Sequence, residues 1–327
     1  MKILSKPNGN AREYGRWAVN AYLGCPNQCQ YCYLQTGPGA KVLGGHKARL
    51  KAGVKNEEHA YHIAMTEIIE HRDEIIRDGG LFFTFTSDPC LPETRDLTFT
   101  IAHEAIAMGI PVTLLTKDAT FHNLDDFEEK TLGYDEEENW RRMVFFSHVA
   151  TKRLDSIRNQ NFHYPKDNTA FGWTLTGHDE LEPNTSPNCE RINAMRSIAE
   201  RGFYTWASIE PVVTFTSSLD MIRQALDAGC QHFKIGLMTS RTKVCRHGFS
   251  LGGHDFEPYD PAECLAFVQD VMQLTRDRAT VFWKQSFREF IGGTPAHCLF
   301  NDDELHKIFD DYPNAVDAQW SMFSNNE

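Results

Sequence analysis

The sequence lacks any apolar run long enough to cross a bilayer. A membrane-spanning helix needs about 20 consecutive, mostly apolar residues, and the 327-residue chain contains no such stretch. Met1-Lys2-Ile3-Leu4 is followed by polar residues, whereas a signal peptide continues into an apolar core. We therefore expect a cytoplasmic protein with no membrane partner.

The cysteines do not form the pattern of a disulfide framework. There are 9 of them, an odd number, and three are grouped between positions 25 and 32. This usage fits a reducing compartment better than a secreted, disulfide-linked domain. The remaining ones are expected to be mostly buried, small apolar residues: Cys90, Cys189, Cys230, Cys245, Cys264 and Cys298.

An excess of basic residues is also absent. Lys and Arg number 33 against 45 Asp and Glu, which gives a formal net charge of −12. Proteins that bind a phosphate backbone usually present a basic face, so this balance counts against generic nucleic-acid binding. The hydrophobic content of 41% is sufficient for the core of one large α/β domain or two average ones.

The most informative stretch is Cys25-Pro26-Asn27-Gln28-Cys29-Gln30-Tyr31-Cys32-Tyr33, with C-x3-C-x2-C spacing. Three thiolates on one loop suit zinc or an iron–sulfur cluster, because both prefer soft sulfur ligands. A structural zinc site needs a fourth ligand, and no second CxxC or CxxH pair lies nearby. A four-iron four-sulfur cluster held by three cysteines keeps one iron open to an exogenous ligand. A redox-active disulfide with a spare thiol is the simpler alternative.

With Tyr33 directly after the third cysteine, the motif resembles that of the radical S-adenosylmethionine superfamily. Two flanking segments, Ala11-Arg12-Glu13-Tyr14 and Asn20-Ala21-Tyr22-Leu23-Gly24-Cys25, are similar to the spore photoproduct lyase-like branch, particularly its small, poorly characterised members. The resemblance implies that the open iron chelates S-adenosylmethionine. It also implies that the reduced cluster cleaves this cofactor to a 5′-deoxyadenosyl radical, which abstracts hydrogen from a substrate.

Apolar runs alternate with helical patterns along the chain, which indicates βαβ units. We predict strands at 17–23, 81–86, 111–117, 171–176, 204–213 and 232–237, a further strand at 281–285, and helices at 56–77, 99–108, 195–201, 219–228 and 261–276. These elements predict an α/β protein with a partial (β/α)6 TIM-type barrel of parallel strands. Its core would span 1–287, with an insertion at 118–168 and a long loop at 239–259. A C-terminal extension at 288–327 would cap the barrel.

Barrel enzymes place their ligands at the carboxyl ends of the strands. By resemblance, the cofactor-binding residues would be Tyr31, Tyr33, Ser87, Asp88, Lys117, Thr174, Arg191 and Glu210, and the cluster ligands Cys25, Cys29 and Cys32. In this interpretation Lys117 meets the methionyl or ribose end of the cofactor. The Arg191 guanidinium would bind the cofactor carboxylate, unless it forms a helix-surface ion pair with Glu190 or a neighbour. Glu210 would accept from a sugar hydroxyl or pair with a buried cation.

The substrate is not specified by these motifs. In the lyase that names the branch, a cysteine three residues before the equivalent of Asp88 donates a hydrogen atom, and this chain has Phe85 there. Cys90 is a candidate substitute donor, or else a packed thiol. A peptide, a metabolite and a nucleic acid base are all possible substrates, with flavodoxin or ferredoxin as the reducing partner. Two alternatives are lyase-like nucleic-acid repair or modification, and a non-catalytic iron–sulfur redox or binding module.

Overall fold

A computed structural model describes residues 2–36, 39–120, 168–240 and 243–292 of the chain. Its centre is an eight-stranded sheet in the order β1-β2-β5-β6-β7-β8-β9-β14. Every neighbouring pair is parallel except β1 with β2. The strands are β1 Leu4–Ser5, β2 Trp17–Val19, β5 Leu81–Phe83, β6 Val112–Thr116, β7 Thr169–Thr174, β8 Tyr204–Val212, β9 His232–Leu237 and β14 Thr280–Trp283. The α/β class and the predominantly parallel sheet of the predicted partial barrel are confirmed.

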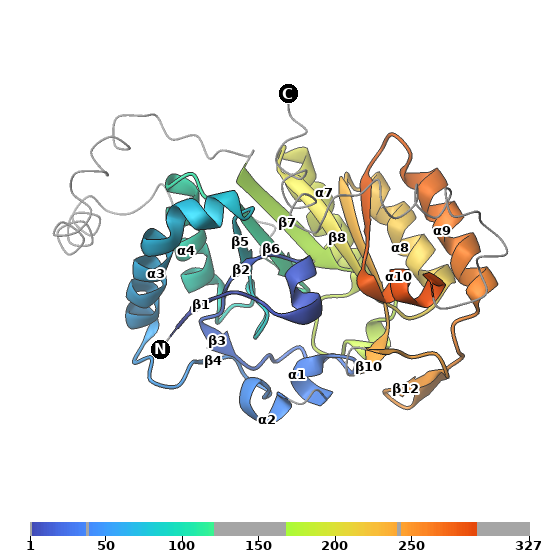
Figure 1. Cartoon of the computed structure of the whole chain (residues 1–327), viewed down its shortest axis with the longest axis horizontal. Helices are drawn as coiled ribbons and strands as arrows, with labels where there is room; N and C mark the ends of the chain where they lie inside the picture. Colours follow the sequence, from blue (N-terminus) through green and yellow to red (C-terminus); the bar gives the residue numbers. More distant parts are fainter. Residues whose placement is uncertain (1, 37–38, 121–167, 241–242, 293–327) are drawn as a thin grey trace.

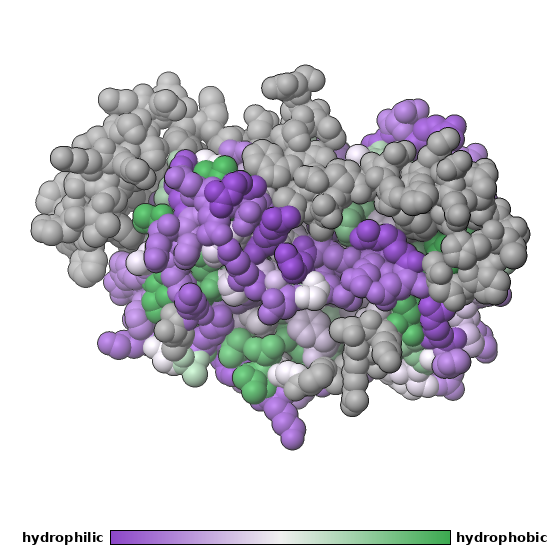
Figure 2. Space-filling model, viewed as in Figure 1, coloured by the Kyte–Doolittle hydropathy of each residue, from purple (hydrophilic) through white to green (hydrophobic). Residues whose placement is uncertain are grey.

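Long helices connect the parallel strands and pack against one face of the sheet (Figure 1). They are α3 Glu57–Arg77, α4 Arg95–Ala107, α7 Asn188–Glu200, α8 Phe215–Asp227 and α9 Pro261–Thr275. Helix α3 begins where the sequence predicts, because the side chain of Asn56 accepts from the His59 backbone N–H and caps the first turn. Among the coloured residues, Figure 2 shows more hydrophilic than hydrophobic surface in this view, as expected once the apolar stripes of these helices are buried.

Side chains alternate between the two faces of the sheet. Leu81 and Phe83 lie in the large core beneath the helices, whereas Phe82 packs with Tyr14 and Trp206 on the opposite face. Successive side chains of a strand point to opposite sides, so one run of apolar residues can serve both clusters. The second face is the interior of the partial barrel, and it also carries polar groups.

The predicted strand at 17–23 is divided in the structure. Its first part is β2 in the main sheet, while β3 (Tyr22–Leu23) pairs with β4 (Arg49–Leu50) in a separate two-stranded ribbon. The cysteine loop therefore follows β3 and not the sheet strand itself. The main sheet also contains β1, which was not predicted and adds an antiparallel edge to the predicted parallel strands.

Short elements gather along the edge of the sheet where its parallel strands end (Figure 1). They are α1 Tyr33–Thr36, α2 Ala40–Leu43, η4 Asp179–Leu181, β10 Thr239–Ser240, β11 Lys243–Val244, β12 Phe249–Leu251 and β13 His254–Phe256. The 239–259 segment, predicted as a loop, thus contains two small ribbons. Two further elements, η1 Gly9–Glu13 and α10 Gln285–Gly292, lie close to β2 and β14 in the sequence.

The described residues cover only the ends of the predicted insertion, and 121–167 lies outside them. The same is true of the predicted C-terminal extension, of which 293–327 is outside the described part. Within the described residues, no helix is both long and apolar enough to span a membrane.

Candidate functional site

The cysteine loop is fixed by backbone hydrogen bonds to its neighbours. The Gly24 N–H donates to Leu43 O at 2.8 Å and the Cys25 N–H to Gly45 O at 3.0 Å. Gly24 has φ +81°, and a Cβ there would lie 2.5 Å from Lys47 O. Glycine is required at this position because a side chain would meet backbone that cannot move aside.

The three thiols of this loop differ in their exposure to solvent. Cys25 and Cys29 are buried and Cys32 is partly exposed. Burial raises the pKa of Cys25 to about 12 and that of Cys29 to about 11; the pKa of Cys32 is also raised by burial. A thiol is a metal ligand only as the thiolate, so deprotonation of this group requires a cationic species beside it.

Asp88 connects the cysteine loop to the ends of β5 and β6. Its carboxylate accepts from the Asn27 amide at 3.1 Å, the Thr116 hydroxyl at 2.6 Å and the Lys117 N–H at 2.8 Å. The Cys90 N–H donates to it as well, at 3.0 Å. Four donors satisfy the carboxylate oxygens, so in this structure Asp88 holds the loop in place and has little capacity left for a ligand.

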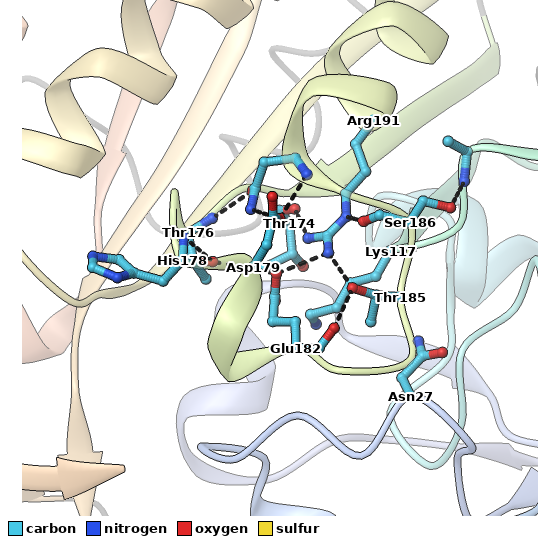
Figure 3. Close-up of polar contacts among 12 residues, drawn as sticks. Asn27, Lys117, Thr174, Thr176, His178, Asp179, Glu182, Thr185, Ser186 and Arg191 are labelled. Carbon is cyan, nitrogen blue, oxygen red and sulfur yellow. Dashed lines mark hydrogen bonds and ion pairs between the residues drawn. The ribbon is translucent and has the colours of Figure 1, made fainter. Parts of the chain in front are cut away.

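Arg191 and Glu182 form a buried ion pair next to the cysteine loop, as Figure 3 shows. The Arg191 Nη2–Glu182 Oε2 distance is 2.8 Å, and both side chains are fully buried. Arg191 also donates to Ser186 O at 2.6 Å and Thr174 O at 2.8 Å. The alternative of a helix-surface ion pair with Glu190 or a neighbour is thus not observed, because the pair is buried and its acid is Glu182. Because its guanidinium is engaged by these acceptors, Arg191 holds the loop after β7 in place and is not available to bind a cofactor carboxylate.

Tyr31 belongs to the same network, because its hydroxyl donates to Glu182 Oε1. Glu182 in turn accepts from the Thr176 hydroxyl at 3.2 Å. Burial raises the pKa of Tyr31 well above its ordinary value, and the charge of Glu182 raises it further. The phenol therefore stays protonated and keeps donating to this carboxylate.

Lys117 contributes a cation to the site. Its Nζ lies 5.6 Å from the centre of the Tyr31 ring, and Figure 3 places it beside the Glu182–Arg191 pair. Burial lowers the pKa of Lys117, but the charges of Cys29 and Glu182 outweigh burial, and the net pKa is raised. Within the described residues the ammonium has no hydrogen bond or ion pair of its own, so it is available to an anionic ligand.

Ser87 and Thr174 are buried near the carboxyl ends of β5 and β7. The Ser87 Oγ has no hydrogen-bond partner among the described residues. A buried hydroxyl without a partner costs free energy, and such an atom next to a binding loop is a candidate ligand contact. Thr174 contributes its carbonyl to Arg191.

Glu210 lies apart from these residues, in a polar cluster inside the barrel. Its Oε2 accepts from the Tyr14 hydroxyl and from Lys284 Nζ at 2.5 Å. Two roles were considered for Glu210, and the structure shows the second of them, in which its carboxylate pairs with a buried cation, Lys284. Lys234 belongs to the same cluster and donates to Glu13 O at 2.7 Å. The part played by Lys234 was not predicted, since it is a single charge within an apolar strand.

Cys90 and Tyr33 differ strongly in their exposure to solvent. Cys90 is 0% exposed and lies in the core beneath the helices, which favours the packed thiol over the hydrogen donor. Tyr33 is 52% exposed, and its hydroxyl donates to Phe85 O. Phe85 itself stacks on Phe82, with ring centres 4.5 Å apart.

Sequence reasoning missed Glu182 and Asn27, which hold the site together. A signal existed for Glu182, because it precedes the buried Arg191 by nine residues on the same loop and helix. Among the described residues, no group of three or more His, Cys, Asp or Glu side chains converges on one point as a site for a single metal ion.

The comparisons with known proteins concern the fold. No protein-family model matches the chain, and no curated protein matches it significantly. The fold is that of solved spore photoproduct lyase structures. One, a mutant of that lyase, superposes with a TM-score of 0.53 at 16% identity, over 86% of this chain and 80% of that chain. Another, the lyase complexed with a dinucleoside spore photoproduct, gives a TM-score of 0.52 at 16% identity over the same shares.

Proposed function

We propose that the chain is a radical S-adenosylmethionine enzyme, with a four-iron four-sulfur cluster held by Cys25, Cys29 and Cys32. The observation that carries the proposal is the grouping of three thiols and the unpaired Lys117 ammonium on one edge of a parallel sheet. The similarity of fold to spore photoproduct lyase supports it. When bound, the cluster and S-adenosylmethionine would supply a 5′-deoxyadenosyl radical that abstracts hydrogen from a substrate.

The donor set fits such a cluster. Soft thiolates are the usual ligands of iron–sulfur clusters, and the buried thiols here need a cationic partner to ionise. A cluster spreads its thiolates over separate irons, so the proposal requires no convergence of three side chains on one ion. The third cysteine is partly exposed, which leaves an approach to that side of the loop.

Each neighbouring residue then has a defined role. Lys117 would pair with the carboxylate of S-adenosylmethionine, because its ammonium has no ion pair with any other described residue. Ser87 Oγ would find its missing partner on the same cofactor. Asp88, Arg191 and Tyr31 would act as positioning residues, since their polar groups are already engaged by the protein. Thr174 and Tyr33 stay proposals for contacts with the cofactor or the substrate, whereas the Glu210 carboxylate is engaged by Tyr14 and Lys284.

Anaerobic reconstitution with iron and sulfide tests the cluster. We expect about four iron atoms per chain and visible absorbance that disappears in a variant with Cys25, Cys29 and Cys32 changed to Ala. Cys189→Ala is the matched control, because Cys189 is an exposed cysteine on α7. Equal iron content in the triple variant and the wild type would contradict the proposal.

Repair or modification of a nucleic acid base is a second candidate, because one similar structure is complexed with a dinucleoside spore photoproduct. The net charge of −12 and Phe85 favour instead a peptide, a protein side chain or a small metabolite as the substrate. The chain would receive its electron from flavodoxin or ferredoxin. A non-catalytic iron–sulfur module would bind no S-adenosylmethionine, so calorimetry with this cofactor separates that alternative.

A further inference from the structure

Three side chains outside the cysteine site form a relay of hydrogen bonds. His178 Nδ1 lies 2.7 Å from Glu180 Oε1, and His178 Nε2 lies 3.0 Å from Ser217 Oγ. His178 and Glu180 come from the loop after β7, and Ser217 comes from the first turn of α8. A carboxylate, an imidazole and a hydroxyl in this order and at these distances are the arrangement that activates a serine nucleophile.

The neighbouring groups determine where the protons lie. The Glu180 carboxylate can only accept, so the neutral imidazole carries its proton on Nδ1 and leaves Nε2 as an acceptor. Ser217 then donates its hydroxyl proton to Nε2. The Thr214 hydroxyl, 2.7 Å from Ser217 Oγ, can donate to that oxygen. The Thr214 carbonyl is a second acceptor in reach of Ser217, but it is farther away, at 3.2 Å.

The hydroxyl of Ser217 is not needed to cap the helix. Thr214 performs that role, because its side chain accepts from the Ser217 backbone N–H. Ser217 is partly exposed and lies in the first turn of α8, where N–H groups have no acceptor within the helix, although its own N–H is accepted by Thr214. Such N–H groups, with the positive end of the helix dipole, favour an oxyanion.

The surroundings of the imidazole are apolar on one side. Phe256 meets the His178 ring edge to face, with centres 5.8 Å apart, and Phe249 stacks on Phe256 at 5.1 Å. Gly177, directly before His178, has φ +70°, and a Cβ there would lie only 3.0 Å from Ser217 Cβ and 3.3 Å from Met221 Cγ, so glycine lets this loop pack closely against α8. A short apolar acyl group suits these neighbours better than a charged one.

We propose that Ser217, His178 and Glu180 form a hydrolytic centre for carboxylic esters with a short, apolar acyl group. Ser217 Oγ bonds to the ester carbonyl carbon while its proton passes to His178 Nε2. The same proton then leaves with the alcohol as the ester C–O bond breaks. Water, deprotonated by His178, releases the carboxylic acid and restores the Ser217 hydroxyl. The reaction consumes one ester and one water, and it requires no metal, cluster or electron donor.

A fluorophosphonate probe and p-nitrophenyl butyrate test this centre on the full chain without reconstitution. We expect the probe to modify Ser217, as identified by peptide mass spectrometry, and Ser217→Ala to abolish both modification and ester hydrolysis. His178→Gln should slow both by about 100-fold or more, because it removes the general base. Changing Cys25, Cys29 and Cys32 to Ala should alter neither, so failure of the cluster and failure of the esterase are distinguishable.

Thr216→Ala is the matched control, since Thr216 is an exposed hydroxyl in the same turn of α8. It should react like the wild type. Thermal unfolding of Ser217→Ala should stay within about 2 °C of the wild type, because Thr214 keeps the cap. The proposal is overturned if the probe does not modify the wild-type chain, or if Ser217→Ala is modified and hydrolyses the ester at the wild-type rate.

Discussion

At the scale of single residues, the Arg191–Glu182 pair stabilises the loop that faces the cysteines. Both side chains are fully buried, and removing one partner of such a pair leaves an uncompensated charge. We predict that Glu182→Gln lowers the free energy of unfolding by about 3–5 kcal/mol, as measured by urea denaturation of the protein without a cluster.

A second variant separates charge from packing at this position. Glu182→Leu combined with Arg191→Met removes both charges and should recover part of the lost stability, because no unpaired ion is left behind. If Glu182→Gln unfolds at the wild-type urea concentration, the pair does not have the structural role assigned to it.

Lys234, inside the barrel, makes the stability of the folded protein depend on pH. Burial, reinforced by the nearby Lys284 charge, lowers the pKa of Lys234 to about 7, against the opposing effects of Glu13 and Glu210. In the unfolded chain a lysine has a pKa of about 10.4. Between these two values the unfolded state binds more protons than the folded state, so this residue makes the protein more stable as the pH rises.

We therefore predict that the wild type gains stability relative to Lys234→Met as the pH increases from 7 to 10. Urea denaturation of both proteins across that range measures the difference, and all other titrating groups are common to the two. A difference that stays constant over the whole range would show that Lys234 titrates normally in the folded state.

The sequence identified the residues whose chemistry is visible in a local pattern. The three cysteines occur on one short loop, and Lys117 follows a recognisable strand. Glu182 was harder to identify, because its importance comes from buried contacts with Arg191, nine residues further on, and with Tyr31 of the cysteine loop. The role of Asp88 changed for a similar reason, since its four donors come from three separate segments.

At the scale of elements, Gly24 sets the path of the cysteine loop. It has φ +81° and no space for a Cβ, which would lie 2.5 Å from Lys47 O. We predict that Gly24→Ala lowers both the free energy of unfolding and the iron content after reconstitution. Gly9→Ala is the control, because Gly9 also has a positive φ of +57° but nothing within 4 Å of the added Cβ.

Comparison of these two variants separates backbone strain from the steric contact. Alanine is strained in the left-handed conformation at both positions. Only at position 24 does its Cβ also collide with backbone that cannot move aside. Iron binding by Gly24→Ala equal to that of Gly9→Ala would mean that the loop adjusts without cost.

Elements with a strong local signal were predicted well. Helix α3 combines an apolar stripe with an Asn56 cap, and β9 occupies the predicted positions 232–237. The prediction of one continuous strand at 17–23 was wrong, because β3 lies outside the main sheet and pairs with β4. Such pairings depend on residues far along the chain, and the two-residue strands β1 and β4 are too short to give a periodic pattern.

At the scale of the whole molecule, parallel topology explains why separate segments form one site. Parallel strands end at the same edge of a sheet, so the loops after β5, β6, β7 and β8 are brought together there. The alternation of strand and helix patterns predicted the parallel strands, and the structure gives their order. The contents of 121–167 and 293–327 lie outside the described residues.

The net charge of −12 gives a prediction about nucleic acids. We expect no measurable binding of duplex DNA by fluorescence anisotropy at 50 mM salt, since few phosphates would be neutralised. Binding at 50 mM that weakens by about 1,000-fold at 200 mM would reveal many phosphate contacts. That result would favour the nucleic-acid alternative over a peptide or metabolite.

The central claim is that three thiols hold a cluster which cleaves S-adenosylmethionine. Its most direct test is to incubate the reconstituted, dithionite-reduced protein with S-adenosylmethionine without oxygen and to measure 5′-deoxyadenosine by liquid chromatography. We predict that 5′-deoxyadenosine forms with the wild type and is lost when Cys25, Cys29 and Cys32 are changed to Ala. A wild-type protein that carries its full complement of iron and yet yields no 5′-deoxyadenosine would contradict the account.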